Sequence, residues 1–118
     1  MANGRKILCP LPEYGEETES GEWASDYFVV VPDRWLVRHA VRRDEVLDKW
    51  GDELGNTDGL KFAISMALAD DWNLPGLGGN PENWDFSEFD LEIARWVNSV
   101  IFDSFAACWY VKKNLLKL

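Results

Sequence analysis

The segment from residue 73 to residue 81, Asn-Leu-Pro-Gly-Leu-Gly-Gly-Asn-Pro, is the strongest break in this chain. Three glycines and two prolines in nine residues favour turns and end regular elements. We therefore expect a loop here, with the flanking segments packing as separate elements. No Lys-Ser/Thr pair follows the glycines, which argues against a phosphate-binding loop and a nucleotide site.

A helical pattern leads into this loop. From Leu60 to Trp72, apolar residues recur at spacings of three and four, which is typical of a helix with one buried face. Asn56 or Thr57 can cap its amino end. The pattern predicts a helix over residues 58–72, with Trp72 in the core.

A second helical pattern follows the loop. Asn80 is a good N-cap for a short helical turn over residues 81–84, and Ser87 or Asp90 can cap the last and longest helix. One face of that helix carries Phe89, Ile93, Trp96, Val97, Val100 and Ile101. We expect Trp96 to be a core residue for this reason.

The amino-terminal half predicts less regular structure. Residues 1–26 contain six acidic and two basic residues and several Gly and Pro, which favours an extended acidic arm. The β-rich residues 27–31 predict a short strand that stops at Pro32, and a helix follows to Trp50. The expected fold class is mostly α: three to four helices in a single domain over residues 27–118, with a short strand or extended arm before them.

Charge and length exclude several classes of function. The chain has 118 residues, 47% hydrophobic and 28% charged, which fits one folded domain. Its net charge of -9 argues against nucleic-acid binding and against an anionic membrane surface. No signal peptide is visible, and the longest apolar stretch, residues 105–111, is far shorter than the ~18–20 residues of a membrane span. We expect a cytoplasmic protein with reduced thiols.

Catalytic and metal-binding patterns are missing from the sequence. Cys9, His39 and Cys108 come from separate segments without the paired spacing of a zinc site. His39 has no neighbouring nucleophile and is expected to be a partly buried, hydrogen-bonded residue. The acidic pairs Asp70/Asp71 and Glu88/Asp90 are formally able to act as acid and base, but adjacent acids usually form a solvated surface. We expect no enzymatic activity, no cofactor and no metal.

One region resembles a known family. Asp71-Trp72-Asn73-Leu74, the Gly-rich break, the run Asn80-Pro81-Glu82-Asn83-Trp84-Asp85 and the helix opening at Leu91–Val97 occur in this order. Together they resemble the small tail assembly proteins, or tail assembly chaperones, of long-tailed bacteriophages. The likeness spans residues 69–100, whereas residues 1–55 show none.

The resemblance implies a non-catalytic chaperone in the host cytoplasm. Such a protein binds the helical tape measure protein and helps to recruit tail tube subunits. Near the carboxyl end, apolar residues cover more of the helix circumference than one small core can bury. We therefore expect Phe102, Trp109 and Tyr110, together with Trp84, to contact the partner. Self-association is the plain alternative. Many such tail proteins are extended by ribosomal slippage, and the codons of Lys112-Lys113 could carry a slippery run.

Two other classes of function stay open. An acidic, aromatic-rich protein could inhibit a host nucleic-acid-binding or defence protein by occupying its nucleic-acid site. A structural connector subunit of the virion would form stable closed oligomers and remain in purified particles.

Overall fold

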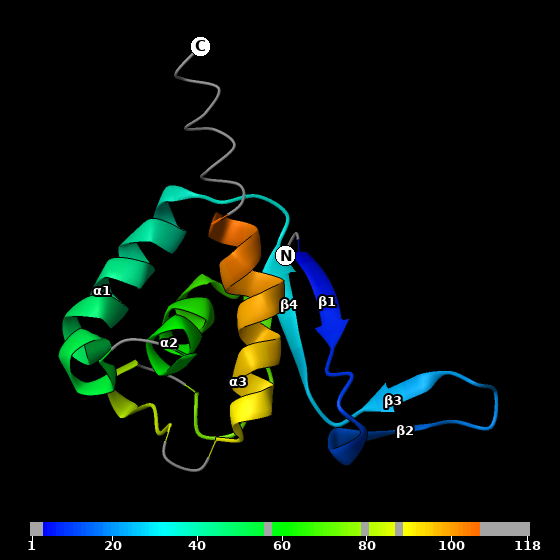
Figure 1. Cartoon of the computed structure of the whole chain (residues 1–118). Coiled ribbons are helices and arrows are strands. Elements are labelled where there is room, and N and C mark those ends of the chain that lie inside the picture. Colours follow the sequence, from blue (N-terminus) through cyan, green and yellow to red (C-terminus); the bar gives the residue numbers. More distant parts are fainter. Residues whose placement is uncertain (1–3, 56–57, 79–80, 87–88, 107–118) are drawn as a thin grey trace.

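The fold is a mixed α/β structure, in which three helices pack beside a three-stranded sheet and a separate two-stranded hairpin projects outward (Figure 1). The computed structural model describes residues 4–55, 58–78, 81–86 and 89–106. The expected mostly α fold class is therefore wrong. The reason lies in the amino-terminal segment, because residues 4–26, expected to form an extended arm, contain three strands.

The central strand of the larger sheet is β4 (Phe28–Pro32), close to the strand predicted at residues 27–31. It pairs antiparallel with β1 (Gly4–Leu8) on one side and with the two-residue β5 (Asp71–Trp72) on the other. Its valines are buried, as β-branched residues in a covered strand should be. The sheet therefore joins the amino-terminal segment and the middle of the chain to one buried strand.

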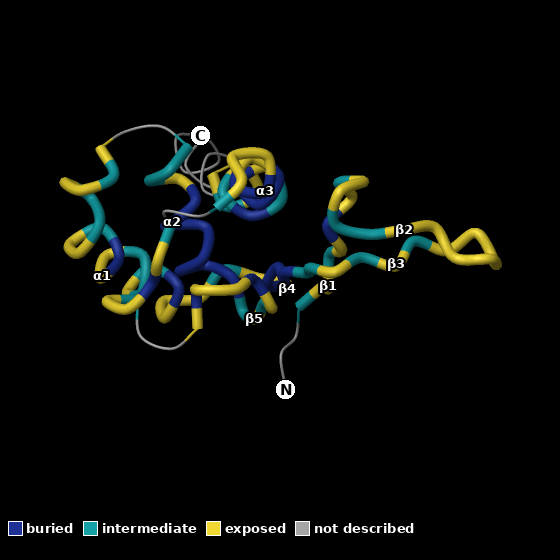
Figure 2. The backbone as a smooth tube through the Cα atoms, turned by 90° about the horizontal axis from the view of Figure 1, so that it is seen from below, coloured by how far each residue is buried: buried dark blue, intermediate teal, exposed yellow. Residues whose placement is uncertain are grey.

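The hairpin consists of β2 (Gly15–Glu17) and β3 (Trp23–Ser25) and follows a short 3-10 turn, η1 (Pro12–Tyr14). Figure 2 shows that it extends away from the helices and that its tip is exposed. Trp23 fastens its base, since the indole Nε1 donates a hydrogen bond of 2.7 Å to the carbonyl oxygen of Cys9. A Cβ atom on Gly15 would lie 2.6 Å from this indole, so only glycine fits there.

Three helices form the rest of the domain. They are α1 (Val37–Leu54), α2 (Asp58–Leu68) and α3 (Leu91–Val97), which continues into a π-helical turn, η3 (Asn98–Phe102). Helix α2 is buried at every position from Phe62 to Leu68, because it lies between α1 on one side and α3 with its continuation η3 on the other (Figure 2). Within the described residues, no helix has both the length and the apolar character needed to cross a membrane.

Helix α2 ends earlier than predicted. Asp70 and Asp71, acidic residues at a carboxyl end where the helix dipole disfavours them, leave the helix. The backbone N–H of Asp70 instead donates to the carbonyl oxygen of Val30 at 3.0 Å, and Asp71 pairs with the same strand. Pairing with β4 therefore replaces the last turn of the predicted helix. The sequence pattern of residues 58–72 could not show this, because the pairing partner lies in a different segment.

The two tryptophans expected in the core differ in burial. Trp96 is 9% exposed and belongs to the core, as predicted. Trp72 is only partly buried at the edge of the core, where its Nε1 donates 3.0 Å to the carbonyl oxygen of Leu77. The difference follows from the strand: Trp72 lies in β5 rather than on the inner face of α2.

Candidate functional site

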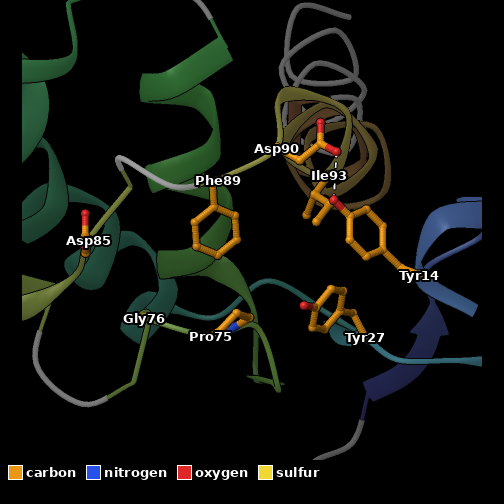
Figure 3. Close-up of a pocket in the computed structure, with 8 residues that line it drawn as sticks. All are labelled: Tyr14, Tyr27, Pro75, Gly76, Asp85, Phe89, Asp90 and Ile93. Atoms are coloured by element: carbon orange, nitrogen blue, oxygen red, sulfur yellow. Dashed lines mark hydrogen bonds between the residues drawn. The ribbon is translucent and has the colours of Figure 1, made fainter.

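A pocket of about 230 Å³ lies between the base of the hairpin and the start of α3 (Figure 3). It is lined by Tyr14, Tyr27, Pro75, Gly76, Asp85, Phe89, Asp90 and Ile93. Residues that are far apart in the sequence therefore meet at one place. Of these eight residues, two are acidic and none is basic.

Asp90 and Tyr14 form the upper rim of the pocket (Figure 3). Asp90, one of the two predicted candidates, is the N-cap of α3. Its Oδ1 accepts a hydrogen bond of 2.9 Å from the backbone N–H of Glu92. The hydroxyl of Tyr14 donates to the other carboxylate oxygen at 2.8 Å. The cap of one helix therefore holds an aromatic side chain from the hairpin base.

These contacts shift the titration of both groups. The hydrogen bond to Asp90 raises the pKa of Tyr14 to about 12. The backbone hydrogen bond from Glu92, followed by that from Tyr14, lowers the pKa of Asp90. At neutral pH the rim therefore consists of an ionised carboxylate beside a neutral phenol.

The Tyr14 titration gives a direct test of this contact. The raised pKa favours the protonated phenol in the folded protein, so the stability from this contact is complete below about pH 10 and is lost as the pH rises toward about 12. In a pH titration that follows tyrosinate absorbance, the phase with the highest pKa should belong to Tyr14 and should therefore disappear in Tyr14→Phe. In Asp90→Ala, which removes the acceptor, the Tyr14 phase should return toward its ordinary value; an unchanged phase would contradict the contact.

Two further aromatic rings form the walls. The ring centroid of Tyr27, just before β4, lies 5.3 Å from that of Tyr14 with an angle of 45° between the planes. The ring centroid of Phe89 lies 5.2 Å from that of Phe62 in the buried helix α2. The core thereby holds Phe89 in place on the side facing the two tyrosines (Figure 3).

The predicted loop provides the floor. Gly76 has a φ of 77°, a backbone conformation that favours glycine, and its carbonyl oxygen accepts 3.1 Å from the N–H of Asp85. Asn73 joins the loop to the hairpin base, because its side chain donates to the Asp26 carbonyl at 2.9 Å and accepts from the Phe28 N–H at 2.7 Å. The Gly-rich break thus connects both halves of the pocket.

His39 lies in a separate, closed cluster. It is hydrogen-bonded, as predicted, but fully buried where partial burial was expected, and its Nδ1 accepts a hydrogen bond of 2.9 Å from the backbone N–H of Leu36. An acceptor nitrogen carries no proton, so Nε2 is the protonated nitrogen and donates 3.1 Å to Asp70, which also pairs with Arg38. The His39 and Asp70 side chains are only 1% and 7% exposed, so this cluster is largely closed to solvent.

The acidic pair Asp70/Asp71 does not act together. Asp70 points to His39, whereas Asp71 is exposed and its carboxylate accepts from the N–H of Trp72. Across the described ranges, no group of three or more His, Cys, Asp or Glu residues is arranged to hold a metal ion.

The residues expected to contact a partner are placed differently from one another. Trp84 is 3% exposed and packs against Trp72 and Phe86 in the core, so its ring is not available on the surface. Phe102 is partly exposed at the end of η3, with Lys61 Nζ 5.5 Å from its ring centroid. Trp109 and Tyr110 lie outside the described residues.

The sequence did not predict the pocket because its residues are distant along the chain. Tyr14 and Asp90 are 76 positions apart, and no local pattern relates them. The only signal was the N-cap role of Asp90, which locates a fixed carboxylate but not its neighbours.

Comparisons with protein-family models, with curated proteins and with solved structures found no match. The described fold and site define a small α/β protein with an acidic, aromatic-walled pocket beside a projecting hairpin.

Proposed function

We propose that this protein is a non-catalytic tail assembly chaperone of a long-tailed bacteriophage, which binds the tape measure protein in the host cytoplasm. The observation that carries the proposal is the family likeness of residues 69–100. Those residues include β5, the Gly-rich loop and α3. Six of them line the pocket: Pro75, Gly76, Asp85, Phe89, Asp90 and Ile93. The part of the chain that resembles the family is therefore also the part that meets the hairpin.

The surface suits a protein client. The hairpin region from Glu13 to Asp26 contains six acidic residues and no basic one, which attracts a client segment rich in Lys and Arg. At the start of α1, Val37 and Val41 are 81% and 51% exposed and share one helix face. Charge would speed the encounter, and the exposed apolar side chains would add contact area for an amphipathic helix.

The client interaction can be tested with overlapping fragments of the tape measure protein from the same genome. We expect at least one fragment to bind, as measured by calorimetry. The variants Phe102→Ser and Trp109→Ser/Tyr110→Ser should bind it about tenfold more weakly, as truncated aromatic contacts at interfaces do. Leu91→Ser, which alters an exposed apolar residue elsewhere, is the matched control.

Circular dichroism separates a binding defect from unfolding. The variants should keep the helical signal of the parent, and loss of that signal would assign these residues to the core. If no fragment binds the parent protein, the chaperone proposal fails.

The gene offers an independent test. A slippery run at the codons of Lys112-Lys113, followed by an overlapping frame of domain length, would support the chaperone role. Without an overlapping frame this support disappears, and the two lysines keep their ordinary interpretation as cations suited to a helix carboxyl end.

A second candidate, an acidic inhibitor of a host nucleic-acid-binding or defence protein, is favoured by one observation. Glu13, Glu16 and Asp26 line a second hollow of about 280 Å³ on the hairpin. Carboxylates grouped on a projecting element resemble the charge, though not the shape, of a nucleic-acid backbone. Release of host proteins from immobilised DNA by the purified protein would support inhibition, whereas its presence in purified virions would instead indicate a structural connector.

A further inference from the structure

The pocket in Figure 3 combines aromatic walls with a fixed negative charge, and this combination is selective for one kind of ligand. We propose that it binds an alkylated ammonium group, the chemistry shared by choline and by an N-methylated lysine side chain. The ligand would enter between Tyr14, Tyr27 and Phe89, with Asp90 supplying the opposite charge. This inference goes beyond the chaperone role and does not depend on it.

The size of the pocket fits a small head group. Its volume of about 230 Å³ is below the ~300–1,000 Å³ of pockets that enclose drug-sized ligands. A nucleotide or a large cofactor therefore exceeds it, whereas the end of one side chain or a small organic cation can be enclosed.

The walls attract a cation without hydrogen bonds. The face of an aromatic ring is negative because of its quadrupole, so a cation within ~6 Å of the ring centroid is attracted. Tyr14 and Tyr27 are neighbours on one side, and Phe89 lies across from them (Figure 3). The methyl groups of an alkylated ammonium also gain from contact with these apolar surfaces.

The rim favours an alkylated ammonium over a primary one. Both oxygens of Asp90 already accept a hydrogen bond, one from Glu92 and one from Tyr14. A primary ammonium brings three N–H donors that each need an acceptor, whereas a quaternary ammonium brings none. Asp90 has about two lone-pair positions left for three donors, so it satisfies a primary ammonium only in part, whereas a quaternary cation requires only the negative charge.

The site is also held in place before a ligand arrives. Phe89 packs against Phe62 of the core, and Asp90 and Tyr14 hold each other. A ligand then loses little affinity to the ordering of side chains on binding.

Titration of the full chain with choline, followed by NMR chemical shifts, tests the proposal. Its neutral isostere, 3,3-dimethylbutan-1-ol, has the same shape without the charge. We expect choline to bind roughly tenfold more tightly than the alcohol, in keeping with a partly desolvated cation–π contact. Shifts should concentrate at the pocket residues.

Two variants separate the charge from the rings. Asp90→Asn keeps an N-cap and an acceptor for Tyr14 but removes the charge, so it should weaken choline binding by about fivefold. Phe89→Leu keeps an apolar side chain but removes the ring face, so it should weaken binding by roughly threefold or more. Asp103→Asn, on an exposed acid elsewhere, should bind like the parent.

The source of the group is resolved with two peptides of the same sequence, one with trimethyllysine and one with unmodified lysine. Tighter binding of the methylated peptide than of choline assigns the pocket to a modified protein, and the reverse assigns it to a free small molecule. Equal binding of choline and the alcohol, an unchanged affinity in Asp90→Asn, or no choline binding at ~10 mM, well above ordinary ligand affinities, overturns the proposal.

Discussion

Replacing Phe62 by alanine should lower the free energy of unfolding by about 3–5 kcal/mol, the usual cost of removing a buried aromatic side chain. Phe62 is 2% exposed in the middle of α2. Its ring centroid lies 5.7 Å from that of Phe86 and 5.2 Å from that of Phe89, so the cavity would open beneath two further rings. Against a typical total of ~5–15 kcal/mol, this is a large fraction.

Urea unfolding monitored by circular dichroism measures the effect. Phe28→Ala is the matched control, because Phe28 is only partly buried and Lys6 Nζ lies 4.3 Å from its ring centroid. We expect a clearly smaller loss in the control. If the two variants unfold at the same urea concentration, Phe62 is not the centre of the core.

The variant His39→Leu should lose about 2–4 kcal/mol, because it removes one hydrogen-bond partner from a partly buried backbone N–H, at the lower end of the usual ~1–3 kcal/mol, and one from a buried carboxylate. The first is the backbone N–H of Leu36, which donates to His39 Nδ1. The second is the carboxylate of Asp70, whose side chain is 7% exposed and keeps only Arg38 as an ion-pair partner within the described residues.

Thermal unfolding of a small series checks this assignment. Asp70→Asn retains an acceptor for His39 Nε2 and should cost less than His39→Leu. Arg38→Gln removes an ion pair whose Arg side chain is 58% exposed, and such pairs contribute only ~0–1 kcal/mol. A His39→Leu protein as stable as the parent would show that neither hydrogen bond stabilises the fold.

The local pattern of apolar, capping and breaking residues determined several elements without tertiary information. The valines of β4 were predicted as a strand, and Asp90 was one of two predicted caps for the last helix. The irregular segment at residues 73–78 and the short turn η2 (Pro81–Asn83) follow from Gly and Pro. Each depends on a few neighbouring residues, which is why a single sequence sufficed.

The mostly α prediction failed where strands are short or polar. Strand β1 exposes Arg5 and Lys6 at an edge of the sheet, where charged side chains are common and hide the alternation of a strand. Strand β5 has only two residues, and one of them, Trp72, also continues the helical pattern of apolar residues. Its pairing with β4 makes this segment a strand. Trp84 was expected to contact a partner but is buried. The sequence around it contains no pattern that indicates its packing against Trp72 and Phe86.

The amino-acid sequence by itself determined the Asp90 cap, the Gly- and Pro-rich loop, the buried strand and the acidic charge of residues 13–26. The tertiary structure alone decided which strands pair and that Tyr14 meets Asp90 across 76 positions. The physical reason is that caps, turns and periodic faces are set by interactions within a few residues, whereas strand pairing and pockets depend on which distant segments the core brings together.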